Sequence, residues 1–119
     1  MARILLAEDD EGMRQFLVTA LTRAGHDVAS FPDGRTALSA LVEPFDLLIA
    51  DVVMPGIDGI ELARRARNAN PDARVMFITG FAAVVLDGGR PVVPRATVLS
   101  KPFHLRDLVA EVERILADA

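Results

Sequence analysis

The hydrophobic positions of the chain fall into five short runs, each about the length of a β-strand. Several of these runs are continuous rather than alternating, which is typical of strands that are buried on both faces of a parallel sheet. The runs are Arg3–Ala7, Val28–Phe31, Leu47–Ala50, Val75–Thr79 and Thr97–Ser100. They predict the strands of one parallel sheet.

The stretches between the runs carry apolar residues three or four positions apart, as amphipathic helices do. Gly25 and Pro44 follow two of these stretches, and both residue types commonly end helices. The predicted helices are Met13–Ala24, Arg35–Val42, Gly59–Arg67 and Leu105–Leu116. Strands that alternate with helices through short connections predict an α/β fold, with helices on both faces of the sheet.

The segment Phe81–Ala96 departs from this alternation. Ala82–Leu86 begins like a helix, but glycines and prolines soon interrupt it. The interrupting residues are Gly88, Gly89, Pro91 and Pro94. We therefore expect a short or mobile fourth helix followed by an irregular loop.

Composition narrows the class of protein. The chain has 119 residues, of which 51% are hydrophobic and 25% charged, as expected for one globular domain. The formal net charge of -4 argues against nucleic acid or an anionic membrane as a partner. The absence of cysteine excludes disulfides, zinc-thiolate sites and thiol catalysis. We expect a cytoplasmic protein, because we find neither a signal peptide nor an apolar run that could cross a bilayer.

Polar residues follow the predicted central strands at their carboxyl ends, where open α/β sheets bind ligands. Neighbouring carboxylates repel one another and so raise each other's pKa. Mg²⁺, which prefers oxygen ligands, would remove this repulsion. A lysine and a hydroxyl suit phosphate oxygens, and an aspartate can be a nucleophile toward phosphorus. The residues are Glu8, Asp9, Asp51, Thr79 and Lys101. Asp51 is the best nucleophile candidate because it stands alone at the middle strand, whereas Asp10 and Glu11 are expected to begin the first helix.

Four separated motifs, in this order, resemble those of bacterial response-regulator receiver domains. They are "ILLAEDD", "LLIADVVMPGIDGIEL", "MFITG" and "LSKPF". The resemblance implies a doubly wound, flavodoxin-like or CheY-like fold with a five-stranded parallel sheet of order 2-1-3-4-5 and five helices. It covers residues 1–119 as one receiver domain, and we expect no output domain.

The resemblance also implies site roles. Asp51 would accept a phosphoryl group from a histidine kinase or histidine phosphotransferase. Thr79 matches the switch hydroxyl of the family and Lys101 matches its phosphate-binding lysine, which a cis-prone Pro102 follows. The protein would therefore be a phosphoacceptor signalling domain, catalysing only its own metal-dependent phosphotransfer.

The same resemblance implies a site for Mg²⁺, or another divalent ion such as Mn²⁺. Asp9 and Asp51 would be direct ligands, and the backbone carbonyl of Val53 would be a third. Glu8 would act mainly through water.

A narrower resemblance concerns single-domain receivers that control the ClpXP protease during the bacterial cell cycle. It rests on "MFITGFAAV", "VLSKPFHLRDLV" and "MPGIDGIELARRA". It implies that the unphosphorylated protein engages the ClpX unfoldase as an adaptor for protease substrates or further adaptors, in part at a cell pole. Phosphorylation would switch this activity off.

Two other functions stay open. A stand-alone receiver can instead be a phosphate shuttle or a phosphate sink. A phosphatase of the haloacid-dehalogenase type would need a second aspartate two residues after the nucleophile, and Val53 occupies that position. The nucleophile of such phosphatases also normally follows the first strand, so this alternative is disfavoured.

One departure from the family pattern concerns signal transmission. Many receivers carry an aromatic residue three positions before the conserved lysine, and here that residue is Val98. We therefore expect the change on phosphorylation to lie mainly in residues 81–94.

Overall fold

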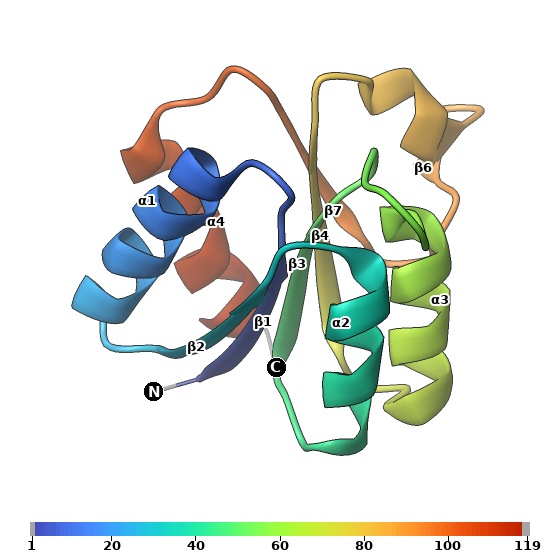
Figure 1. Cartoon of the computed structure of the whole chain (residues 1–119). Helices are drawn as coiled ribbons and strands as arrows, with labels where there is room; N and C mark the ends of the chain where they lie inside the picture. Colours follow the sequence, from blue (N-terminus) through green and yellow to red (C-terminus); the bar gives the residue numbers. More distant parts are fainter. Residues whose placement is uncertain (1, 118–119) are drawn as a thin grey trace.

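The computed structural model describes residues 2–117, with a five-stranded parallel sheet at its centre (Figure 1). The strand order is β2-β1-β3-β4-β7. This confirms the predicted order 2-1-3-4-5, since β7 is the fifth strand of the main sheet. The strands are β1 (Arg3–Ala7), β2 (Asp27–Phe31), β3 (Leu47–Asp51), β4 (Arg74–Thr79) and β7 (Thr97–Ser100).

Helices cover both faces of the sheet, as predicted. Helices α1 (Glu11–Arg23) and α4 (Leu105–Ala117) lie on one face. Helices α2 (Gly34–Leu38) and α3 (Gly59–Ala69) lie on the other (Figure 1). The predicted helix Arg35–Val42 is divided, because a 3₁₀ turn, η1 (Ser39–Val42), completes it.

Four of the five expected helices are α-helices in the described residues. At the fourth position the chain forms only a 3₁₀ turn, η2 (Ala82–Val85), so the prediction of a short fourth helix is confirmed. The glycines and prolines that follow cannot extend a helix.

The segment after η2 is more regular than the expected loop. Strands β5 (Leu86–Asp87) and β6 (Arg90–Pro91) form a small antiparallel hairpin. Its turn residues Gly88 and Gly89 have φ values of 60° and 82°. A two-residue hairpin turn of type I′ needs positive φ at both central residues, so the Gly-Gly pair was the signal for this hairpin.

The core has two parts, one on each face of the sheet. Alternate residues of β1 enter opposite parts: Ile4 and Leu6 pack toward α1 and α4, whereas Leu5 and Ala7 pack toward α2 and α3. Strand β3 is buried along its whole length, as its continuous apolar run predicted. Among residues 2–117, no helix has both the length and the apolar character needed to cross a membrane.

The starts of two helices shape the carboxyl edge of the sheet. We call this edge, where Glu8, Asp9, Asp51, Thr79 and Lys101 lie, the rim. Asp10 caps α1 and Asp58 caps α3, each accepting a backbone N–H bond with its side chain. The prediction that Asp10 begins the first helix is thus confirmed. A Cβ atom on Gly59 would lie 2.2 Å from the carbonyl oxygen of Asp51. Only glycine therefore lets α3 start directly behind Asp51.

Candidate functional site

The three predicted acids meet at the carboxyl ends of β1 and β3. One carboxylate oxygen from each of Glu8, Asp9 and Asp51 lies within 4.8 Å of the others. Glu8 is 0% exposed and Asp51 7% exposed, whereas Asp9 is exposed to solvent. The cluster therefore opens to solvent on the side of Asp9.

Lys101 connects this cluster to β7. Its Nζ donates hydrogen bonds to Glu8 Oε1 at 2.9 Å and to Asp51 Oδ2 at 2.8 Å. Burial opposes the charged ammonium, but the hydrogen bonds with Asp51 and Glu8 outweigh that effect and raise the pKa of Lys101. Lys101 therefore carries its charge at neutral pH.

Glu8 is buried more deeply than any other acid of the rim. Burial raises the pKa of Glu8, although hydrogen bonds from Lys101 and from the Asp10 backbone oppose the rise. Arg14, in the first turns of α1, donates from Nη1 to the backbone carbonyl of Glu8 at 2.8 Å. The sequence did not predict this role of Arg14, because only its position on a helix facing β1 could have indicated the contact.

Asp51 and Asp9 differ in how firmly they are held. The Asp51 carboxylate accepts the Val53 backbone N–H at Oδ1, at 3.2 Å, in addition to the Lys101 bond. Among residues 2–117, the Asp9 carboxylate has no hydrogen-bond or ion-pair partner. The proposed role of the Val53 carbonyl as a metal ligand stays a prediction.

Thr79 ends β4 beside the cluster and is 0% exposed. Its Oγ1 accepts the backbone N–H of Phe81 at 2.9 Å. Its carbonyl accepts the backbone N–H of Lys101 at 2.8 Å, which ties β4 to β7 at the rim. The next peptide bond, Lys101–Pro102, is cis, as the resemblance implied.

The charges of the rim suit a divalent cation. Three carboxylates face one ammonium, which leaves an excess of negative charge around a point that solvent can reach. Oxygen ligands from one or two carboxylates, completed by water or phosphate, are what Mg²⁺ prefers. The same rim offers an ammonium and a hydroxyl for phosphate oxygens.

Comparison with known proteins identifies the family. Residues 4–113 match the profile of the response regulator receiver domain. The chain belongs to the response regulator receiver family. Its function is therefore that of a signalling domain, which replaces the haloacid-dehalogenase alternative.

Two relatives of this receiver, one of them in two solved structures, are informative. The response regulator receiver protein CpdR of Brucella abortus is 58% identical over 120 residues, which is 100% of each chain. The receiver TrrA of Thermotoga maritima, solved in complex with Mg²⁺ and BeF, has a TM-score of 0.85 and 28% identity, covering 98% of this chain and 100% of that one. A structure of TrrA with the histidine kinase ThkA gives a TM-score of 0.83 at 28% identity, covering 98% and 99% of the two chains.

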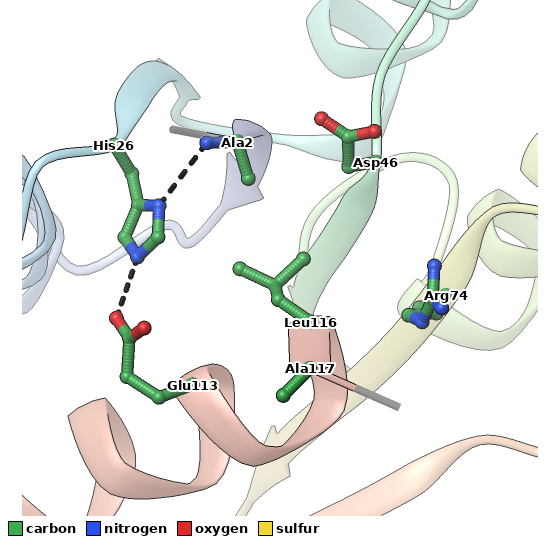
Figure 2. Close-up of a pocket in the computed structure, with 7 residues that line it drawn as sticks. All are labelled: Ala2, His26, Asp46, Arg74, Glu113, Leu116 and Ala117. Carbon is green, nitrogen blue, oxygen red and sulfur yellow. Dashed lines mark hydrogen bonds and ion pairs between the residues drawn. The ribbon is translucent and has the colours of Figure 1, made fainter. Parts of the chain in front are cut away.

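The opposite end of the receiver's sheet holds a second charged cluster that the sequence analysis did not predict. His26 Nδ1 accepts the Ala2 backbone N–H at 3.3 Å, and Nε2 lies 2.7 Å from Glu113 Oε1 (Figure 2). Because Nδ1 accepts, the ring proton lies on Nε2 and is donated to Glu113. A hollow of about 410 Å³ adjoins this pair, with Asp46 and Arg74 also in its lining. Through these contacts His26 connects the start of β1 to α4.

Proposed function

We propose that this chain is a single-domain response regulator that accepts a phosphoryl group on Asp51. The observation that carries the proposal is the Lys101 ammonium, which bridges Glu8 and Asp51 beside the buried Thr79 hydroxyl. The end-to-end match to CpdR supports a receiver that acts without an output domain.

The donor would be a phosphohistidine of a histidine kinase or histidine phosphotransferase. An Asp51 carboxylate oxygen attacks phosphorus, a P–O bond forms and the P–N bond to the imidazole breaks. The bonding electron pair stays on the imidazole nitrogen, which then takes a proton. The kinase complex of the related TrrA supports a donor of this class.

Glu8, Asp9, Asp51 and the Val53 carbonyl would hold Mg²⁺ or Mn²⁺, with Glu8 acting mainly through water. When bound, the ion neutralises charge that develops on the transferring group. Lys101 lies close to Asp51, so its ammonium can bind a phosphoryl oxygen once the Asp51 carboxylate has become an acyl phosphate.

Thr79 would change its hydrogen bonds when Asp51 is phosphorylated. Its hydroxyl now accepts from Phe81, and a phosphoryl oxygen would favour rotation of the hydroxyl toward the rim, where it can donate. That rotation breaks the bond to Phe81 and releases the start of residues 81–94. Val98 is a half-buried residue of the core on the α3 face, so the usual aromatic is not available to transmit this change.

We further propose that the unphosphorylated form is an adaptor that controls ClpXP-type proteolysis and, through it, the cell cycle. The 58% identity to CpdR supports this reading. The partners would be the ClpX unfoldase and protease substrates or further adaptors, in the cytoplasm and in part at a cell pole.

Recovery of ClpX tests this function. Wild type, Asp51→Ala and the control Asp10→Asn would be used to capture purified ClpX, with and without prior phosphorylation. The adaptor reading predicts that phosphorylation releases ClpX from wild type and from Asp10→Asn but not from Asp51→Ala. Phosphotransfer to Asp51 without any ClpX capture would support the alternative, a phosphate shuttle or sink.

A further inference from the structure

A groove lies between the outer part of α3 and the chain that follows the β5–β6 hairpin. It encloses about 420 Å³. Three guanidiniums line it together with an apolar wall, and we call it the arginine groove. The lining includes Arg64, Arg67, Arg95, Val92, Pro71 and Pro94.

Among the described residues, 2–117, the positive charges of the arginine groove have no carboxylate partner. Arg67 donates from Nε to the Ala73 carbonyl at 2.7 Å and from Nη1 to the Pro94 carbonyl at 2.5 Å. Arg95 donates from Nη2 to the Pro71 carbonyl at 3.2 Å. No carboxylate is among the lining residues, although the chain has more acidic than basic residues.

Arg64 also has no carboxylate partner among the described residues. It is exposed, and among residues 2–117 it has no hydrogen-bond or ion-pair partner. Its neighbour Arg65 points elsewhere and pairs with Glu61 at 3.0 Å. One helix therefore holds a neutralised arginine outside the groove and an unneutralised one inside it.

Placing these arginines together has an energetic cost. Burial lowers the pKa of Arg67, and the charge of Arg95 lowers it further. Arg95 also has a φ of 63°, a left-handed conformation that is uncommon for a residue with a Cβ atom. Such a strained, like-charged arrangement is stabilised when an anion enters it.

We propose that the arginine groove binds an acidic peptide segment of a partner protein, one that also carries apolar side chains. Guanidiniums bind carboxylates through paired hydrogen bonds, and Val92 with the two prolines offers an apolar surface for the adjacent side chains. Nucleic acid fits less well, because the lining has no aromatic residue for base stacking and the whole chain is acidic. The groove shares no residue with the rim, so this inference does not rest on the proposed function.

The test uses ¹⁵N-labelled full-length protein and a ten-residue probe peptide that alternates aspartate or glutamate with leucine or valine. We expect the peptide to shift amide signals of α3 and of residues 92–95, and to bind more weakly at high salt. The double variant Arg64→Ala/Arg95→Gly should bind at least about tenfold more weakly, because it loses charge-assisted hydrogen bonds.

Two features keep the test independent of folding. Glycine adopts a φ near 63° without strain, so Arg95→Gly should keep or raise the melting temperature while binding falls. The matched control Arg65→Ala removes the same charge from the same helix outside the groove, and should bind the peptide as wild type does.

Three results would overturn the proposal: no localised shifts, shifts that survive in the double variant, or equal losses in Arg65→Ala. A matching peptide with lysine in place of the acids should not bind. Inorganic phosphate and single-stranded DNA are parallel probes. If either gave the same shifts at lower concentration than the peptide, the groove would be a phosphate or nucleic-acid site instead.

Discussion

The charged residues are paired differently at the two ends of the central sheet. At the amino end, two acids each have a partner of their own. Arg3 pairs with Asp27 at 2.7 Å, and His26 pairs with Glu113 at 2.7 Å (Figure 2). At the carboxyl end, Glu8 and Asp51 share one ammonium, and Asp9 has no partner among the described residues. The amino-end acids are thus paired one to one, whereas burial disfavours the charge of Glu8 at the carboxyl end.

We therefore expect charged residues at the carboxyl end of the sheet to serve the chemistry, and those at the amino end to serve stability. Neutralising an acid at the rim should impair metal or phosphoryl chemistry and leave the metal-free fold as stable as before or more so. Breaking a pair at the amino end should lower stability and leave the chemistry intact.

Asp51→Asn should abolish phosphorylation, because the amide cannot attack phosphorus. Incubation with a phosphorylated histidine phosphotransferase, followed by intact-protein mass spectrometry, measures the added phosphoryl group. Asp10→Asn is the matched control, since asparagine caps a helix as well as aspartate does. If Asp51→Asn still gained a phosphoryl group, the assignment of the phosphoacceptor would be wrong.

Asp9→Asn should weaken Mg²⁺ binding at least about tenfold. Loss of a residue that only supports a metal ligand typically costs about 10- to 100-fold in affinity, and Asp9 is proposed as a direct ligand. Isothermal titration calorimetry measures the affinity. Glu113→Gln, at the other end of the sheet, should bind Mg²⁺ normally; an equal loss in both variants would contradict the separation of the two ends.

His26→Ala should lower the free energy of unfolding by about 1 to 3 kcal/mol, because it leaves the Ala2 N–H without its acceptor and opens a small cavity. Urea unfolding followed by circular dichroism measures this. Glu113→Gln keeps an oxygen that accepts from His26 Nε2, so it should cost less. Phosphorylation of His26→Ala by the same donor should proceed as in wild type under folding conditions.

Glu8→Gln should raise the stability of the metal-free protein at neutral pH. The pKa of Glu8 is raised in the fold, so ionising Glu8 destabilises the folded state relative to the unfolded chain. The advantage of the variant should therefore develop as pH rises from the ordinary glutamate pKa of 4.5 to the raised pKa of Glu8, and should vanish below 4.5. A constant difference between the two proteins from pH 4 to pH 7 would show that Glu8 ionisation is not its cause.

Much of the fold could be predicted because it depends on local pattern. Continuous apolar runs predicted β1 and β7 with their observed ends, and the other three strands to within a residue at either end. The segment after Thr79 was harder, because Ala82–Leu86 has helical spacing while the two glycines favour a turn. The structure has a turn at these glycines, which forms the β5–β6 hairpin, since positive φ at both glycines fits no helix.

The sequence by itself determined which residues end each strand, and so which chemistry reaches the rim, because strand ends follow from local hydrophobic pattern. Only the tertiary structure decided how those residues pair. Lys101 meets Glu8 across 93 positions, and His26 meets Glu113 across 87. The arginine groove likewise needs α3 packed beside a segment that lies beyond β4. Such contacts depend on strand order and helix packing, which bring together residues that no local spacing relates.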